Sequence, residues 1–296
     1  MDGTDWLAAE FQAHRAHLRA VSYRMLGSLA EADDAVQETW LRLTTAGGDD
    51  VRNMRAWLTT VVSRICLDML RARAARHEEP LDAHVPDPVV TPVEDDPEQH
   101  ALLADSVGLA LLVVLDTLSP AERLAFVLHD VFAVPFEEIG PVLDRSPAAA
   151  KQLASRARRR LRGADAPARR GAADPARQRE VAEAFLAAAR GDDFDGLLAV
   201  LDPGVVLRAD AGTGPFAPSR LISGAANVAT EAHRFASLAR MAQPVLVNGT
   251  PGFLVAHGGQ PLALIGLAIR DGVITEIDIL ADPDRLGRLA LAGLTG

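Results

Sequence analysis

Residues 77–98, HEEPLDAHVPDPVVTPVEDDPE, constrain the fold of this chain most, because they divide it. The segment holds five prolines and eight acidic residues but no lysine or arginine. Proline removes backbone hydrogen-bond donors and the acidic charges repel one another, so this composition predicts neither a helix nor a share in a hydrophobic core. We therefore expect a linker at residues 77–101, between a helical block at 1–76 and another at 102–163.

The two helical blocks are recognised by their apolar periodicity and their glycines. From Leu7 to Arg76 there is no proline, and Gly27, Gly47 and Gly48 separate the periodic segments, which predicts three or four helices. The second block ends in GADAPARRGAADPA, whose small residues, glycine and proline predict a second linker at 164–175.

Residues 176–296 have a different character. An amphipathic helix opens the block, and a second is expected near GAANVATEAHRFASL. Short segments rich in β-branched residues, separated by turn pairs such as Asn248-Gly249 and Asp271-Gly272, predict antiparallel hairpins. The expected fold is therefore multidomain: two all-α domains, the second with a helix-turn-helix, followed by an α+β domain with helices on one curved sheet.

The formal net charge of −10 conceals a local excess of positive charge. Residues 77–106 hold nine acidic residues and no basic one, whereas residues 146–163, SPAAAKQLASRARRRLRG, hold six basic residues and no acidic one. The net charge therefore does not argue against an anionic partner for the second of these segments.

The surroundings of this basic segment predict a helix, a short turn and a second helix. Ser146 is a favourable N-cap, Pro147 fits the first helical position, and Pro141 predicts a bend in the helix before the turn. The second helix has an apolar stripe formed by Ala150, Leu153, Ala154, Ala157 and Leu161. A helix that is apolar inside and cationic outside is typical of DNA recognition, and a merely solvated basic face is the alternative.

Other features exclude several protein classes. The single cysteine, Cys66, excludes an intrachain disulfide and a multi-cysteine metal site, and its helical context favours burial. The first residues lack the features of a secretory signal, and the longest apolar run, at 107–115, is too short to span a bilayer. We expect a cytoplasmic protein with no membrane partner, no metal and no cofactor.

Three motifs resemble those of the extracytoplasmic-function sigma factors of RNA polymerase. EADDAVQETWLRL, residues 31–43, resembles the helix that docks on the clamp helices of core RNA polymerase. MRAWLTTVVSRICLDMLRARA, from residue 54, resembles the helix that melts and reads the minus-ten promoter element. LSPAERLAFVLHDVFAVPFEEIGPVLDRSPAAAKQLASRARRRL, residues 118–161, resembles the domain that binds the minus-thirty-five element. Arg64 departs from many relatives, which carry asparagine there.

The resemblance implies core RNA polymerase and promoter DNA as partners, and it implies the residues that bind them. Polymerase would be bound by one polar helix face, formed by Asp33, Asp34, Gln37 and Glu38. The minus-ten element would be contacted by Arg52, Asn53, Arg55, Trp57 and Arg64. The minus-thirty-five element would be contacted by Arg145, Ser146, Lys151, Gln152, Ser155, Arg156, Arg159 and Arg162. Lys151, Gln152 and Ser155 are placed for base edges and the three last arginines for phosphates.

Residues 176–296 resemble the SnoaL-like domains of the NTF2-like fold, a cone-shaped sheet around a pocket, which are fused to some of these sigma factors. Relatives of that fold include polyketide cyclases with a general base, so Asp210, His233 and Asp278 are candidates for one, with turn or capping roles as the alternative. The fused sigma factors carry an Asp-Gly-Gly-Gly-Lys motif, which DAGTG at 210–214 matches in part. They also carry an Asn-Pro-Asp-Lys-Leu motif, which DPDRL at 282–286 matches closely. The implied regulatory contact, against the linker or the first block, would use Asp210, Asp282, Pro283, Asp284, Arg285 and Leu286.

We therefore expect a transcription initiation factor that is not an enzyme and is controlled in cis by residues 176–296. Its acidic linker would thread the channel that nascent RNA later occupies, or act only as a disordered spacer. Two other functions stay open: a helix-turn-helix regulator with a ligand-binding domain, and a cyclase- or isomerase-like enzyme with a DNA-binding appendage. A small ligand in the pocket of the third domain also stays open.

Overall fold

The computed structural model describes residues 3–47, 51, 53–75, 84–93, 109–163, 174–212, 219–289, 291, 293 and 294. The chain forms two compact units: a helical unit of residues 1–79 and 114–166, and a sheet unit of residues 80–113 and 167–296. Within the described residues, no helix is both long enough and apolar enough to cross a membrane.

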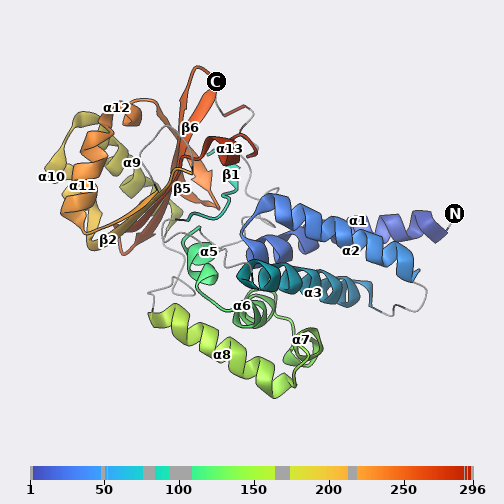
Figure 1. Ribbon diagram of the computed structural model, residues 1–296. Coiled ribbons are helices and arrows are strands. Elements are labelled where there is room, and N and C mark those ends of the chain that lie inside the picture. Colours follow the sequence, from blue (N-terminus) through green and yellow to red (C-terminus); the bar gives the residue numbers. More distant parts are fainter. Residues whose placement is uncertain are drawn as a thin grey trace. The chain divides into compact units, whose positions relative to one another are not determined.

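The described residues of the first block form three helices, within the predicted number of three or four: α1 (Gly3–Leu26), α2 (Leu29–Ala46) and α3 (Met54–Ala75) (Figure 1). Ser28 caps α2 by accepting a hydrogen bond from the Glu31 amide, and Gly47 ends that helix in a left-handed conformation at φ 79°. Leu18, Leu43 and Leu58 are fully buried and come from three different helices, so they fix this first bundle by packing.

The second bundle of the helical unit contains the predicted helix-turn-helix. After α5 (Leu109–Asp116), which crosses the boundary between the units, come α6 (Pro120–Phe126), η1 (Val127–Val131), α7 (Phe136–Val142) and α8 (Pro147–Gly163). Ser146 accepts a hydrogen bond from the Ala149 amide at 3.2 Å, which confirms the predicted cap. Pro141 lies in the last turn of the seven-residue α7, which ends one residue later, so its ring disturbs little of the helix.

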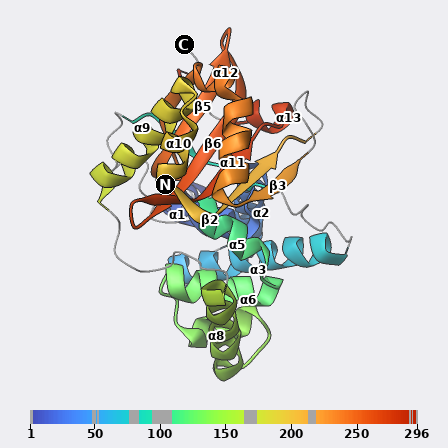
Figure 2. The same cartoon turned by 90° about the vertical axis from the view of Figure 1, so that its left-hand side faces the viewer.

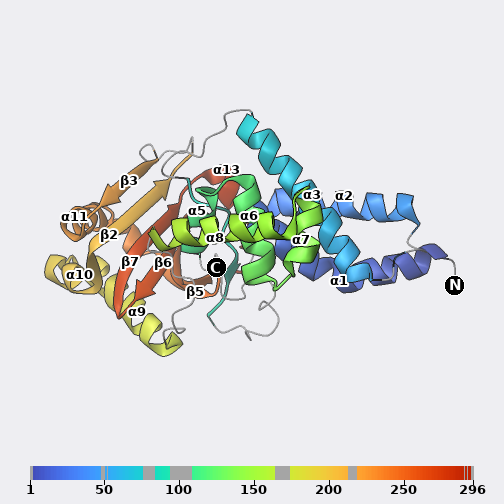
Figure 3. The same cartoon turned by 90° about the horizontal axis from the view of Figure 1, so that it is seen from below.

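In the part of the sheet unit that the structure describes there are seven strands and five further helices. The helices are α9 (Pro175–Gly191), α10 (Phe194–Val200), α11 (Ala225–Arg234), α12 (Ala236–Ala239) and α13 (Pro283–Leu286). The strands are β1 (Val90–Thr91), β2 (Leu201–Asp210), β3 (Arg220–Ser223), β4 (Ala242–Val247), β5 (Thr250–His257), β6 (Gln260–Arg270) and β7 (Val273–Leu280). Figure 3 shows β3, β2, β7 and β6 in succession, part of the full order β1-β4-β5-β6-β7-β2-β3.

The predicted hairpins are confirmed, with one exception to the antiparallel pattern. The turn pairs Asn248-Gly249 and Asp271-Gly272 have positive φ at both positions and join β4 to β5 and β6 to β7. β2 and β7, however, run parallel, because the chain between them crosses over through β3, α11 and three further strands.

Each face of the sheet has its own cover. Helices α9, α10 and α11 lie across one face, where Phe185, Val228 and Phe253 belong to a single apolar core (Figure 2). Residues alternate between faces along a strand, so Gly266, between the core residues Ile265 and Leu267, points to the opposite face. There a β-carbon on Gly266 would lie within 3.1 Å of Leu109, the first residue of α5.

The expectation that the acidic segment contributes nothing to a core is wrong for residues 84–93. Val85 is fully buried, and β1 pairs antiparallel with the edge strand β4, Val90 opposite Val247 and Thr91 opposite Leu246. A short edge strand tolerates neighbouring prolines, because only some of its amides need to donate into the sheet. The described part of the predicted linker thus belongs to the sheet unit.

Candidate functional site

The four residues expected to bind polymerase lie on the side of α2 that faces away from its buried residues Ala35, Val36 and Leu43. Asp34 and Gln37 are exposed. Asp33 accepts two hydrogen bonds from Arg19 of α1, at 2.7 and 3.2 Å, and Glu38 pairs with Arg42 at 3.0 Å. Two of the four are therefore held by neighbouring cations, and Asp34 and Gln37 form the more open half of the face.

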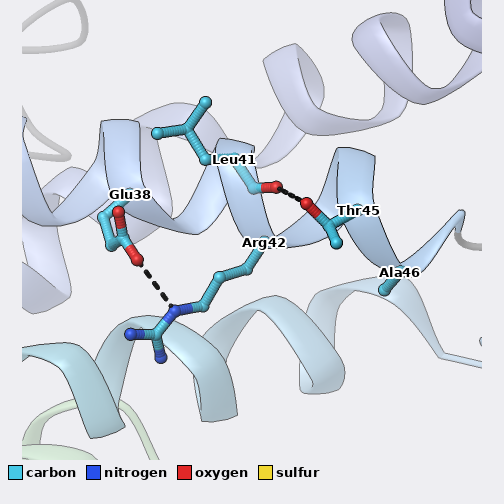
Figure 4. A pocket seen from close by; sticks show the side chains of 5 residues that line it. All are labelled: Glu38, Leu41, Arg42, Thr45 and Ala46. Atoms are coloured by element: carbon cyan, nitrogen blue, oxygen red, sulfur yellow. Dashed lines mark hydrogen bonds and ion pairs between the residues drawn. The ribbon is translucent and has the colours of Figure 1, made fainter.

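Sequence reasoning missed the apolar part of this face. Leu41 is 52% exposed, one turn beyond Gln37. It lines a shallow hollow of about 330 Å³ together with Glu38, Arg42, Thr45 and Ala46 (Figure 4). The signal that could have found it is its spacing from Asp34, because residues 34, 37, 41 and 45 recur at three- and four-residue steps.

The residues expected to read the minus-ten element surround the start and outer side of α3. Asn53 caps the helix, accepting a hydrogen bond from the Ala56 amide at 3.1 Å, so its side chain has a structural role here. Arg55 is exposed and Trp57 half-buried. Arg64 donates a hydrogen bond to the carbonyl of Pro141 at 2.9 Å, while Arg52 lies outside the described residues.

The recognition helix α8 separates its cations into two groups. Of the five residues predicted to form its buried side, Ala150, Ala154, Ala157 and Leu161 are buried, whereas Leu153 is only half-buried. Arg158 pairs with Asp130 at 2.9 Å and Arg160 with the buried Glu122 at 2.8 Å, so both tie α8 to its own bundle. Seven of the residues expected to contact the minus-thirty-five element are exposed: Arg145, Ser146, Lys151, Gln152, Ser155, Arg156 and Arg159. The side chain of Arg162 lies outside the described part of the helix.

Arg285 and Asp210 form the centre of a contact between the linker segment and the sheet unit. Asp210, at the end of β2, accepts hydrogen bonds from the Val85 amide at 3.1 Å and from Arg285 at 2.7 Å. Arg285 of α13 also binds Asp87, at 2.5 and 2.9 Å, and donates to the carbonyl of Val85 at 2.5 Å. One guanidinium thus holds two carboxylates and a backbone carbonyl.

The motifs DAGTG, at 210–214, and DPDRL, at 282–286, meet beside this contact through Gly212 and Asp282. Asp282 caps α13 by accepting hydrogen bonds from the amides of Asp284 and Arg285. Gly212 has φ 51°, and a β-carbon there would collide with the Asp282 carboxylate, so only glycine fits. Pro283 and Asp284 are exposed, and Leu286 is buried within the sheet unit.

A second set of contacts fastens the linker further along. The Val89 amide donates to the Asn248 side chain at 2.7 Å, and the Asn248 amide donates to the Val89 carbonyl at 2.8 Å. Together with β1 these contacts define the linker strap, residues 84–91 lying along the sheet unit. Sequence reasoning missed the strap, although the β-branched run Val89, Val90 and Thr91 between prolines was a signal for a strand.

The strap changes the electrostatics of Asp210. Burial alone would raise the pKa of this carboxyl, but hydrogen bonds from His84 and the Val85 amide, with the charge of Arg285, lower the pKa below its ordinary value. Asp210 therefore stays ionised and serves as an acceptor rather than as a proton carrier.

The three candidates for a general base do not form one site. Asp278 and Glu276 of β7 both bind Arg208 of β2, at 3.1 and 2.8 Å, and burial raises the pKa of Asp278 to about 6 against the pull of Arg208. His233 lies on α11 and pairs with Asp192 at 2.6 Å in an exposed position. Among the described residues, no hydrogen bond joins His233 to Asp210 or Asp278.

Comparisons with known proteins agree on one family. Residues 11–76 match the family model for Sigma-70 region 2, and residues 108–161 match that for Sigma-70, region 4. The chain is 37% identical to the probable ECF RNA polymerase sigma factor SigI of Mycobacterium tuberculosis over 295 residues, which is 98% of both chains. It is 39% identical to the ECF RNA polymerase sigma factor SigJ of that organism, over 94% of this chain and 92% of the other. The crystal structure of SigJ superposes with a TM-score of 0.76 at 35% identity, covering 96% and 99% of the two chains.

Proposed function

The chain belongs to the extracytoplasmic-function sigma factors, which bind core RNA polymerase and direct transcription initiation at promoters, and from that premise we propose that its sheet unit controls this activity by holding the linker. Members of this family are not enzymes. The match to Sigma-70 region 2 also argues against a simple helix-turn-helix regulator, which needs no polymerase-docking helix.

The observation that carries the proposal is the position of Arg285. Its guanidinium joins the linker residues Val85 and Asp87 to Asp210 of the sheet. The linker connects the two bundles of the helical unit, so wherever it is bound it limits how far those bundles can separate. A linker held in the strap is not available to thread a polymerase channel.

Energetics favour a contact that adjusts activity gradually. Linker and sheet unit belong to one chain, which gives a high effective concentration, so even weak contacts are substantially occupied. A change from 1:99 to 99:1 between held and released states requires roughly 5.5 kcal/mol. That is more than the about 2–3 kcal/mol expected from the partly buried contacts of Arg285. Weakening the strap should therefore raise transcription by a graded amount.

Run-off transcription with purified core polymerase tests this control. Arg285→Ala should increase promoter-dependent output, because it releases the linker, and a chain ending after Ala281 should do so more strongly. Arg288→Ala is the matched control, since Arg288 is an exposed arginine three residues along the chain. Equal output from the parent, Arg285→Ala and the truncated chain contradicts control by the sheet unit.

We also propose that α2 docks on polymerase through Asp34 and Gln37, with Asp33 and Glu38 shaping the face through their own ion pairs. Asp34→Lys should weaken the pull-down of core polymerase without unfolding the bundle, because Asp34 is exposed. Glu183→Lys, the same charge change at an exposed position of α9, is the control. Undiminished binding by Asp34→Lys refutes the assignment.

DNA contacts are proposed for Arg55 and Trp57 at the minus-ten element and for the exposed residues of α8 at the minus-thirty-five element. Arg52 and Arg162 stay in the proposal on sequence grounds alone. We place the chain in the cytoplasm, where core polymerase meets the chromosome. A small ligand of the sheet unit would act by favouring or opposing the strap, and thermal shifts of the full chain against a metabolite library would test for one.

A further inference from the structure

The surface that holds the linker strap comes from several elements of the sheet unit. Asp210 ends β2, Arg285 lies on α13, and Asn248 follows β4. These residues, with the β4 edge at Leu246 and Val247 that pairs with β1, form the strap site. None of them belongs to the strap itself, so release of the strap removes the occupant but not the site.

Most contacts of the strap site go to the backbone of its occupant. The Val85 amide donates to Asp210 at 3.1 Å, and the Val85 carbonyl accepts from Arg285 at 2.5 Å. The amide and the carbonyl of Val89 both bind Asn248, at 2.7 and 2.8 Å. Main-chain hydrogen bonds such as these do not depend on the side chain, so they fit any extended segment that reaches them.

The side chains of the strap add a defined selectivity. Asp87 binds Arg285 at 2.5 and 2.9 Å, and its side chain is only 19% exposed. Val85 is fully buried, and Pro86 and Pro88, which flank Asp87, are buried as well. Proline also restricts an extended chain before it binds, which reduces the entropy lost on binding. The preferred occupant is therefore an aspartate between two prolines, preceded by a bulky apolar residue.

Release of the strap requires a ligand that binds the released chain better than the held one. A ligand shifts an equilibrium only by its difference in affinity for the two states. A ligand of the strap site has this difference without any further structural change, because its binding and that of the strap exclude each other. The contacts also define its chemistry, since Arg285 attracts a carboxylate and the β4 edge pairs with an extended backbone.

We propose that the strap site docks a partner protein, which inserts an extended acidic segment of the form apolar-proline-aspartate-proline-apolar in place of the strap. The inference rests on the proposed control by the strap and names the class of partner that relieves it. The inserted segment competes with a strap that is part of the same chain, at an effective concentration in the millimolar range for flexible tethers. Docking is therefore measured best on chains whose own strap is weakened.

Fluorescence anisotropy with a labelled peptide of residues 84–92, HVPDPVVTP, measures docking on the full-length chain. Asp87→Lys in the chain places a cation beside Arg285, and Val85→Lys places one at a fully buried position, so each change empties the strap site. Both variants should bind the peptide with the same Kd, because the site itself is unchanged. Binding to the parent should be about tenfold weaker or more, because only the open fraction of its molecules can bind. Glu183→Lys, at an exposed position of α9, is the control and should bind like the parent.

Two further substitutions locate the peptide on the strap site. Arg285→Ala, combined with Asp87→Lys in the chain, should weaken peptide binding about tenfold, because it removes the donor to both the aspartate and the Val85 carbonyl. Arg288→Ala in the same background should leave the Kd unchanged. A peptide with asparagine in place of its aspartate should also bind more weakly, because it keeps the shape but loses the charge.

Amide hydrogen exchange tests whether peptide and strap exclude each other. The parent chain is labelled with nitrogen-15 and the peptide is not, so only the amides of the chain are observed. Saturating peptide should accelerate exchange at Val85 and Val89, because both amides donate to the strap site only while the strap is held.

Failure of the peptide to bind either strap-released chain, with melting temperatures showing that both variants fold, overturns the proposal. Peptide binding that leaves the Val85 and Val89 amides as protected as before also overturns it, because the peptide then docks elsewhere. Parent dimers that light scattering detects and that disappear in Asp87→Lys would assign the site to a second copy of the chain, against a separate partner. None of these measurements contains polymerase, so control of transcription by the strap is tested separately by the run-off assay of Arg285→Ala.

Discussion

Replacing Arg285 with alanine should loosen the linker strap by an amount that the structure allows us to work out. The substitution leaves two carboxylates and one carbonyl without their shared donor, and the side chains of Asp210 and Asp87 are only 8% and 19% exposed. Removing one partner of a buried ion pair costs about 3–5 kcal/mol. Water reaches part of this site, so we expect about 2–3 kcal/mol for local release of the strap.

Amide hydrogen exchange measures that release. The Val85 and Val89 amides both donate to side chains of the sheet unit, so they exchange only when the strap opens. A cost of 2–3 kcal/mol corresponds to exchange about 30- to 150-fold faster in Arg285→Ala, since 1.36 kcal/mol is tenfold. Arg288→Ala should leave both rates as in the parent. If Val85 exchanges no faster in Arg285→Ala than in the control, the guanidinium does not hold the linker and the reasoning fails.

Three further outcomes are expected. Gln152→Ala should cost about 1–3 kcal/mol in binding to the cognate duplex and so relax the sequence specificity of α8, whereas Arg159→Ala should weaken binding to all duplexes and lower the salt slope by about one. Anisotropy titrations on cognate and random DNA measure both effects. If the two variants change binding to both duplexes equally, the assigned roles are wrong. Gly212→Ala should lower the free energy of unfolding by about 2–3 kcal/mol, because its β-carbon collides with Asp282. Gly258→Ala is the control: its φ is 58° and the space around it is open, so it should cost only the conformational strain. Equal melting temperatures for the two variants would rule out the collision. Burial, with Arg55, His14 and Arg24 nearby, lowers the pKa of His17 to about 4, so the folded protein loses stability as the pH falls from 6.5 toward 4. Burial raises the pKa of Asp278 to about 6, so the folded protein loses stability as the pH rises from about 4 through 6. The melting temperature of the parent should therefore fall relative to that of His17→Phe when the pH is lowered. Relative to that of Asp278→Asn, it should fall when the pH is raised. A difference in melting temperature that does not change with pH would contradict the corresponding assignment.

The helices and hairpins could be predicted because their signals are local. Gly47 ends α2, Ser146 caps α8, and the pairs Asn248-Gly249 and Asp271-Gly272 turn the hairpins, each through the conformation or hydrogen bond of one or two residues. The four residues expected on α2 likewise share one face, because helical spacing decides that without reference to the rest of the chain.

The contacts between distant segments could not be predicted in the same way. The composition of the linker predicts no folded structure, yet Val85 is fully buried. Its burial depends on Arg285, which is 200 positions further along the chain, binds the Val85 carbonyl and neutralises the neighbouring carboxylates. Arg123 and Arg160 look alike in the sequence, as cations near a DNA-binding motif. Tertiary partners alone assign Arg123 to the carbonyl of Arg24 and Arg160 to Glu122.

The pairing of β1 with β4 has a consequence for what happens when the linker leaves. β4 would then become the outermost strand on its side of the sheet, with unpaired backbone groups at Leu246 and Val247 open to any extended segment that fits. Pro244, in the same strand, has no N–H to offer, which shortens the stretch that can accept a neighbour. The released chain is thus the form most exposed to self-association by strand addition, because the occupied strap covers this edge of the sheet.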